Sequence, residues 1–338
     1  NYDRVFGDDH RVSALGYYYM SDEKTASSGT TNMNSIPMRY QGLSSRITYG
    51  FRDTYMIDFN FGYTGSENFQ PGRRFGFFPS VALGWVPTQY EFMRRGLPFL
   101  NFLKIRASYG NDRLAGNQRF PYLTLVNRGS VSPFGSTAVE SLIESYIGAD
   151  NLLWEKAIKA DLGIEGRLFG DKVNFVVDFF NDKRDGIFQQ RVQVPEYVGL
   201  ISQPYSNVGA MRSYGADGNI SFTQRLGKNT WLTLRGNFTY SKNDVENWEE
   251  ANPAYPYQEA SGYPYGVVRG YQSLGLFKDE YDIETSPIQT FGTVMPGDIK
   301  YRDVNGDGRI DADDMVPIAY SFNPLLMYGF GGEFQYKN

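Results

Sequence analysis

Residues 53 to 64, Asp53-Thr54-Tyr55-Met56-Ile57-Asp58-Phe59-Asn60-Phe61-Gly62-Tyr63-Thr64, decide the fold of this chain. Every second residue from Tyr55 to Tyr63 is aromatic or aliphatic, and most of the residues between them are polar or small. Successive side chains of a β-strand point to opposite faces, so this alternation predicts a strand with one apolar face and one wet face.

The same alternation recurs along the chain and predicts ten strands in all. The other nine cover residues 11–20, 43–51, 75–86, 102–109, 158–168, 172–179, 214–225, 232–240 and 326–337. Strands of globular proteins average about five or six residues, whereas strands that cross a membrane need about nine to eleven. Most of the predicted strands belong to the longer class.

The connections between these strands alternate between short and long. Short turns are predicted at 50–53, 169–171 and 226–229, and long loops at 21–41, 110–152, 186–206 and 244–325. Segment 66–74 is a shorter loop on the long-loop side, and 87–101 is a longer connection on the short-turn side. Outer-membrane barrels have short periplasmic turns and long extracellular loops. The sequence therefore predicts an all-β fold, part of a large antiparallel transmembrane β-barrel.

A soluble β-sandwich or β-helix is the alternative fold, because its strands also alternate. That fold accounts for the period of two, but it does not require long and short connections to alternate. Ten strands with so charged an inner face would close only a narrow pore, so a piece of a larger barrel fits better.

Composition limits the function further. The 338 residues carry 38 acidic and 33 basic side chains, a net charge of −5 without long runs of either sign, which disfavours nucleic-acid binding. No Cys is present, and no apolar stretch reaches the roughly 18 residues of a membrane helix. The lone histidine, His10, and the lack of nucleophile or zinc motifs argue against an enzyme. No signal peptide is visible at Asn1.

A calcium-loop pattern lies within residues 303–314, which read Asp-Val-Asn-Gly-Asp-Gly-Arg-Ile-Asp-Ala-Asp-Asp. A hard divalent cation takes six to eight oxygens, so alternate residues of a tightly curled loop must point inward. The predicted ligands of Ca²⁺ are Asp303, Asn305, Asp307, Arg309 through its carbonyl, Asp311 and Asp314. Asp314 stands where Glu is usual, so closure by Asp313 stays open. An acidic turn that binds no metal is the alternative.

Two prolines follow the loop, Pro317 and Pro324, and they leave no room for a long exiting helix. The loop is therefore expected to clip the long extracellular segment 244–325 together, and not to form half of a helical calcium sensor.

The same long segment carries a set of aromatic residues among Pro and Gly: Trp248, Tyr255, Tyr257, Tyr263, Tyr265 and Tyr271. Flat aromatic faces stack on sugar rings or pack against a protein partner. Packing of the loop against itself explains them equally well, and both interpretations remain open.

Several segments, in order, resemble SusC/RagA-type TonB-dependent transporters of Bacteroidetes outer membranes. The resemblance covers nearly the whole chain and rests on residues 78–85, 103–110, 151–156, 270–277, 296–314 and 323–330. It implies a plugged barrel of about 22 strands, of which this chain is the middle-to-late part. The signal peptide, TonB box, plug and closing strands would then lie outside the chain.

The resemblance also implies a function and partners. Such proteins import glycans or peptides in the outer membrane, in contact with its lipid, with a SusD-like surface lipoprotein as a lid and with energy from the TonB complex. Two other functions are open at this stage: a soluble secreted calcium-dependent glycan-binding β domain, and a passive porin without a plug.

Overall fold

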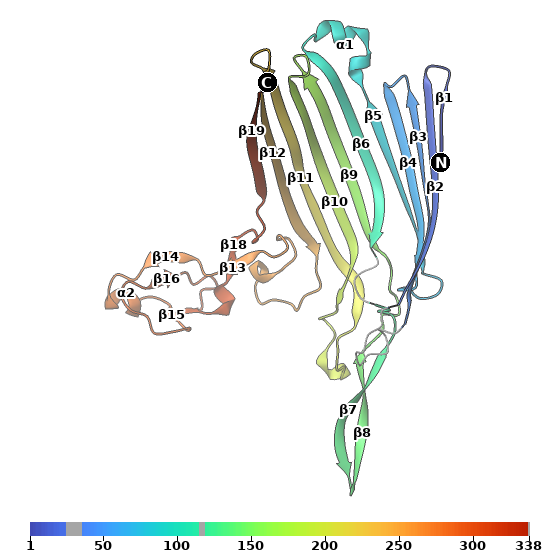
Figure 1. The fold of residues 1–338 in the computed structure, drawn as a ribbon. Coiled ribbons are helices and arrows are strands. Elements are labelled where there is room, and N and C mark those ends of the chain that lie inside the picture. The colour runs from blue at the N-terminus through green and yellow to red at the C-terminus, as the bar shows by residue number, and fades with distance from the viewer. Residues whose placement is uncertain (25–35, 115–118, 337–338) are drawn as a thin grey trace. The chain divides into compact units, whose positions relative to one another are not determined.

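The computed structural model describes residues 1–24, 36–114 and 119–336, and its main feature is an eleven-stranded antiparallel sheet. The strands lie side by side in one layer in the order β1-β2-β3-β4-β5-β6-β9-β10-β11-β12-β19 (Figure 1). Their bounds are β1 Tyr2–Phe6, β2 His10–Glu23, β3 Met38–Phe51, β4 Tyr55–Ser66, β5 Phe75–Trp85, β6 Leu100–Leu114, β9 Glu155–Leu168, β10 Val173–Gln190, β11 Tyr205–Arg225, β12 Thr230–Asn247 and β19 Leu326–Tyr336.

The ten predicted strands are all present, and the expected large antiparallel sheet is confirmed. Two features were not predicted from the sequence: β1, a five-residue edge strand, and a two-stranded hairpin inside the predicted loop 110–152. This hairpin consists of β7, Leu125–Phe134, and β8, Thr137–Tyr146. Residues 25–35 and 115–118 of the predicted loops, and residues 337 and 338, lie outside the described residues.

Strand register places the apolar residues on one face of the sheet. Tyr55, Ile57, Phe59 and Tyr63 of β4 are each 41 to 49% exposed, and their partners Leu83 and Phe77 on β5 are similarly exposed. The opposite face carries polar pairs such as Arg46 with Asp58. An apolar face left open on so many strands is what a lipid-facing wall requires.

The turn between β3 and β4 shows why one end of the sheet has short connections. Arg52 and Asp53 have φ angles of 52° and 47°, in the left-handed region. Two consecutive residues of this kind suit the right-handed twist of a tight hairpin. The predicted longer connection on the same side, 87–101, contains η2, Pro87–Gln89, and α1, Glu91–Gly96.

A small hydrophobic cluster ties the loop segments together at the other end of the strands. Phe69, Ala149, Leu152 and Trp154 are at most 8% exposed, and the rings of Phe69 and Trp154 stack with centroids 4.3 Å apart. The cluster joins the segment after β4 to the segment before β9. The short 3-10 helix η3, Glu196–Val198, lies in the loop between β10 and β11.

The chain divides into two compact units, Asn1–Lys242 with Leu325–Asn338, and Asn243–Pro324. The second unit holds three two-stranded sheets, β13-β18, β14-β16 and β15-β17. Its elements are η4 Pro256–Gln258, β13 Val268–Gly270, β14 Ser273–Leu276, α2 Glu280–Glu284, β15 Ile288–Gln289, β16 Ile299–Tyr301, β17 Arg309–Ile310, η5 Ala312–Asp314 and β18 Val316–Ala319. No helix among the described residues has the length and apolar character needed to cross a membrane.

Candidate functional site

The loop 303–314 is held by its neighbours in the second unit. Its strand β17 pairs in parallel with β15, so that Ile310 lies opposite Gln289, and Ile310 is fully buried. Gly306 and Gly308 have φ angles of 79° and 83°, in the left-handed region that residues with a Cβ atom rarely adopt. These two glycines allow the loop to curl, and Gly308 stands at position six, where the calcium pattern has its glycine.

The oxygen-bearing side chains of the loop accept hydrogen bonds from its own backbone. The two carboxylate oxygens of Asp303 accept from the amides of Gly306 at 2.6 Å and Gly308 at 2.8 Å. The side chain of Asn305 accepts from the Asp307 amide at 3.0 Å, and that of Asp307 from the Arg309 amide at 2.8 Å. Each carboxylate oxygen has two lone pairs, so one amide bond leaves an acceptor position on it.

Asp313 and Asp314 point to different parts of the unit. Asp314 is fully buried, and its carboxylate accepts from the amides of Val304 at 2.7 Å and Asp311 at 3.0 Å. The carboxylate of Asp313 instead accepts from the side-chain amide of Gln258 at 3.0 Å. Of the two aspartates considered for closing the loop, Asp314 is therefore the one that faces into it.

The donor set suits calcium in its chemistry, because it consists of four carboxylates, an amide oxygen and a backbone carbonyl. In the part of the chain that the structure describes, however, no three Asp, Glu, His or Cys side chains are gathered as metal ligands. The carboxylates face the loop amides instead. Binding of an ion would therefore require the side chains to converge on the loop centre, while the backbone curl is already formed.

The six aromatic residues of the second unit pack in separate contacts. The rings of Tyr255 and Tyr257 stack with centroids 5.3 Å apart, and the rings of Trp248 and Tyr265 have centroids 5.8 Å apart. The ring centroid of Tyr271 lies 5.3 Å from that of Tyr301. The guanidinium carbon of Arg269 lies 5.4 Å from the ring centroid of Tyr263. Of the six, Tyr265 is the exposed one, at 57%.

Tyr257 links this aromatic set to the calcium-loop segment. Its hydroxyl donates to the backbone carbonyl of Asp313 at 2.6 Å. Burial raises the pKa of Tyr257, and the neighbouring Tyr255 and the carboxylate of Asp314 raise it further. The stacked pair therefore packs beside the loop 303–314.

On the polar face of the main sheet, one ion pair reaches across an intervening strand. Arg106 on β6 donates to both carboxylate oxygens of Asp178 on β10 at 2.7 Å. Another guanidinium nitrogen of Arg106 lies 3.7 Å from a carboxylate oxygen of Glu165 on β9. Gly163 of β9 is the register partner of both Arg106 and Asp178. Its missing side chain leaves the gap that the guanidinium crosses. The sequence indicated a charged inner face but did not indicate that Arg106 pairs with Asp178.

The segment 151–156 has a structural role that the sequence did not reveal. The Trp154 indole donates to the Arg73 carbonyl at 3.2 Å, and the Asn151 side chain accepts from the Arg73 guanidinium at 3.3 Å. Glu155 is 4% exposed and pairs with Arg184, whose Nε donates to it at 2.9 Å. These contacts fix the entry to β9. The sequence signal is the glutamate that directly follows the apolar run Leu152-Leu153-Trp154.

Comparison with known proteins agrees with this architecture. The profile of the family described as TonB dependent receptor-like, beta-barrel matches residues 1–314. The chain belongs to this family. Members of this family are outer-membrane β-barrel transporters, so the predicted location is confirmed and a soluble secreted domain is disfavoured.

Two curated relatives show the extent of the match. TonB-dependent receptor P39 of Formosa agariphila is 27% identical over the whole chain, which covers 37% of that protein. TonB-dependent receptor SusC of Bacteroides thetaiotaomicron is 25% identical over 87% of the chain, which covers 29% of SusC. The chain thus spans about a third of the length of these relatives.

Solved structures show the same fold. The RagAB peptide importer in its open-open state superimposes with a TM-score of 0.75 at 20% identity, over 99% of this chain and 38% of that one. The closed-closed state gives 0.72 at 21% identity, over 99% and 39%. The predicted SusC/RagA type is confirmed by these matches.

Proposed function

We propose that this chain forms part of the wall of a TonB-dependent importer that takes up oligosaccharides or peptides across the outer membrane. A SusD-like lipoprotein would close its extracellular side, and the TonB complex would supply the energy through parts of the protein outside this chain. The observation that carries the proposal is the antiparallel sheet with its open apolar face, in a chain of the TonB-dependent receptor family.

Uptake by cells tests the proposal. The full-length protein is produced in its own host and in a strain that lacks TonB, and uptake of fluorescent oligosaccharide and oligopeptide mixtures is measured in both. An importer takes up one of the two classes and loses this uptake without TonB. Uptake that continues unchanged without TonB would mean a passive porin.

Copurification tests the lipoprotein partner. The tagged full-length protein is extracted in mild detergent, and the bound proteins are identified by mass spectrometry. A SusD-like lipoprotein present in equal amount supports the proposed lid, and its consistent absence while uptake persists would refute the partnership.

We further propose that the loop 303–314 binds Ca²⁺ through the side chains of Asp303, Asn305, Asp307, Asp311 and Asp314 and the carbonyl of Arg309. The support is the all-oxygen donor set, the two left-handed glycines and the inward-facing Asp314. A bound ion would stiffen the surrounding segment by neutralising its carboxylates. Extracellular calcium modules bind at about 10⁻⁴ to 10⁻³ M.

Limited proteolysis of the full-length protein tests this role. Cleavage within 243–324 is expected to slow when calcium is raised to millimolar concentration and to speed up after chelation, with magnesium at the same concentration as the control. Equal cleavage in all three conditions would refute the calcium clip.

The aromatic residues of the same unit, Trp248, Tyr255, Tyr257, Tyr263, Tyr265 and Tyr271, remain proposed contacts for cargo or partner. Their mutual packing favours a structural role for most of them, and the exposed ring of Tyr265 is the best candidate for stacking on a ligand. A Tyr265→Ala variant that imports as well as the wild type would remove it from the site.

A further inference from the structure

The lumen face of β2 carries two neighbouring aromatic rings. Tyr18 pairs with Leu43 on the lipid-facing side of the sheet. Its two neighbours, Tyr17 and Tyr19, therefore point to the lumen. Tyr17 is 58% exposed, and its ring centroid lies 5.9 Å from that of Tyr19 with 18° between the ring planes. These two nearly parallel rings, Tyr17 and Tyr19, are called the tyrosine platform below.

The ring of Tyr19 is fixed against the wall of the sheet. A Cβ at its register partner Gly42 would lie 2.7 to 2.8 Å from Cε1, Cζ and the hydroxyl oxygen of Tyr19, so the ring covers this glycine. The Tyr19 hydroxyl is also hydrogen-bonded to Thr64 on β4 at 3.1 Å. Tyr17 lies nearly parallel to this fixed ring, and its own hydroxyl has no hydrogen-bond partner among the described residues. That hydroxyl is therefore available to a ligand in the lumen.

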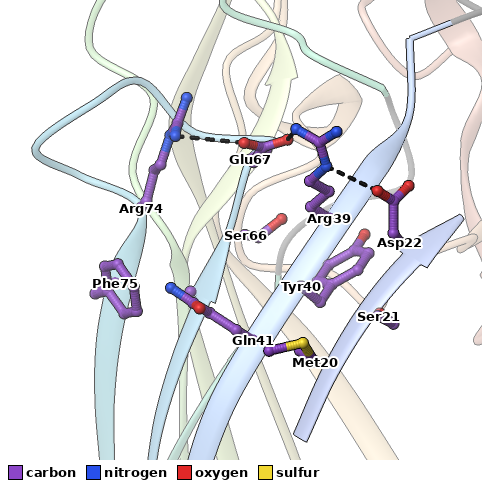
Figure 2. Close-up of a pocket in the computed structure, with 11 residues that line it drawn as sticks. Met20, Ser21, Asp22, Arg39, Tyr40, Gln41, Ser66, Glu67, Arg74 and Phe75 are labelled. Carbon is purple, nitrogen blue, oxygen red and sulfur yellow. Dashed lines mark hydrogen bonds and ion pairs between the residues drawn. The ribbon is translucent and has the colours of Figure 1, made fainter.

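Hydroxyl side chains surround the platform on the lumen face. Ser44 lies directly opposite Tyr17. The next row towards the long loops consists of Ser21, Tyr40 and Ser66, which Figure 2 shows near the outer ends of their strands. The platform thus lies in the outer half of β2, on the side where such barrels have their extracellular loops.

The charged side chains near the platform pair with one another. On its inner side, Nε of Arg46 donates to Asp58 at 2.8 Å, and Asp58 also accepts from the Asn60 side chain at 2.8 Å. At the outer ends of the strands, Figure 2 shows a line of four paired charges: Asp22, Arg39, Glu67 and Arg74. Within the described strands β2 to β5, the rows of Tyr17 and Tyr19 hold no charged residue. The surface around the platform is therefore polar but uncharged.

We propose that the tyrosine platform is a stacking subsite for neutral oligosaccharide cargo in the lumen. One sugar ring packs on the exposed face of Tyr17, while the Tyr17 hydroxyl and the neighbouring Ser44 exchange hydrogen bonds with the sugar hydroxyls. This inference rests on the proposed import function and narrows its cargo to uncharged glycans.

The chemistry of the surface distinguishes a neutral sugar from other cargo. C–H groups on one face of a sugar ring pack on the electron-rich face of an aromatic ring, and this contact requires no charge. Sugar hydroxyls both donate and accept hydrogen bonds, as serine and tyrosine hydroxyls do. Peptides carry charged termini and acidic glycans carry carboxylates. Neither would find an unpaired counter-charge in the rows of the platform, so desolvating their charges there would be unfavourable.

Uptake by cells that produce the full-length protein tests the subsite. Partial hydrolysates of starch, cellulose, mannan and fructan supply neutral oligosaccharides, a pectate hydrolysate supplies acidic ones, and a casein digest supplies peptides. Uptake of each is measured with and without TonB. The wild type is expected to take up neutral oligosaccharides only when TonB is present, and the one taken up fastest is purified for kinetics.

Variants of the platform show whether the ring binds the sugar. Tyr17→Ala should raise the concentration for half-maximal uptake about tenfold and leave the maximal rate unchanged, because one stacked ring is lost. Tyr17→Phe keeps the ring and should recover most of this difference. Tyr17→Leu, which has bulk but no aromatic face, should behave like Tyr17→Ala and replaces it if that variant does not fold.

Tyr18→Ala is the matched control. Tyr18 is the next residue on the same strand and is 57% exposed, almost as much as Tyr17, but it faces the lipid. This variant should take up the oligosaccharide as the wild type does. The difference in gel mobility between unheated and heated samples shows that each variant is folded.

Several results would overturn the inference. Equal half-maximal concentrations for Tyr17→Ala and the wild type would mean that no sugar stacks on the platform. A lower maximal rate at an unchanged half-maximal concentration would mean that the ring packs against another part of the protein. TonB-dependent uptake of peptides or acidic oligosaccharides alone would refute the neutral cargo and leave the proposed import function intact. Uptake of none of the three classes, or uptake without TonB, would instead count against import itself.

Discussion

Substitution of Gly163 by alanine should destabilise the barrel by breaking the ion pair that crosses β9. A Cβ at Gly163 would lie 2.2 Å from Nε of Arg106 and 2.3 Å from a carboxylate oxygen of Asp178. These separations are far below contact distance, so the guanidinium has to leave. Asp178, which is 16% exposed at its side chain and lies opposite Asp217, then loses its counter-charge.

The magnitude follows from the two bonds that are lost. Hydrogen bonds to charged groups contribute about 1.5–3 kcal/mol each, and the partly exposed Arg106 places them at the lower end, about 3 kcal/mol together. Alanine in place of glycine returns about 0.5–1 kcal/mol through lower backbone entropy of the unfolded chain. The expected net loss in free energy of unfolding is about 2 kcal/mol.

Guanidinium unfolding of the full-length protein in detergent, followed by tryptophan fluorescence, measures this change. Gly16→Ala is the control, because a Cβ at Gly16 meets nothing within 4 Å, and this variant should be unchanged or slightly more stable. In an Arg106→Ala background, Gly163→Ala should behave like the control. If Gly163→Ala has the same free energy of unfolding as the wild type, the ion pair contributes no stability and the reasoning is wrong.

Three further predictions concern the parts outside the membrane. Trp154→Ala removes the ring that stacks on Phe69, a truncation that costs about 3–5 kcal/mol in a packed site, so protease cleavage of the joined loops should become faster while the sheet stays intact. Burial raises the pKa of Tyr146 to about 12, so the hydrogen bond from its hydroxyl to the Pro121 carbonyl is fully present below pH 10 and is lost as the pH rises through 12. The wild type should therefore have a higher Tm than Tyr146→Phe below pH 10, and this difference should shrink as the pH rises to 12. A Tm difference that stays constant over this range would refute the prediction. Asp314→Asn should abolish any protection by calcium against cleavage of 243–324, and intact protection would exclude Asp314 as a ligand.

The sequence was most informative where one face of a strand had to be apolar. In β4 the alternation from Tyr55 to Tyr63 fixes both the strand and its face, because a shift of one residue would turn the aromatic rings into the lumen. The hairpin β7-β8 escaped notice because most of its residues are exposed, so neither face imposes a pattern. The short edge strand β1 is exposed throughout and escaped for the same reason.

The alternation of apolar and polar residues does not predict contacts between residues that are far apart in the sequence. Arg106 and Asp178 are 72 residues apart, and their pairing depends on the register of three strands and on the lack of a side chain at Gly163. The calcium-loop pattern could be recognised in 303–314 because its residues are contiguous, and Gly306 and Gly308 have left-handed φ angles. The positions of its carboxylates could not be read from spacing, since they accept loop amides as readily as they would face an ion.

The 21 residues of β11 extend well beyond the apolar band of the membrane. At about 3.4 Å per residue the strand is about 70 Å long, and a tilt of about 45° leaves about 50 Å along the membrane normal. The apolar band of such barrels is about 25 Å tall. Because the turn to β12 at 226–229 is short, most of the excess of about 25 Å lies on the outer side, where the strand passes through the headgroup region and ends beyond it. Cargo reaching this rim would meet the protein before it meets the membrane.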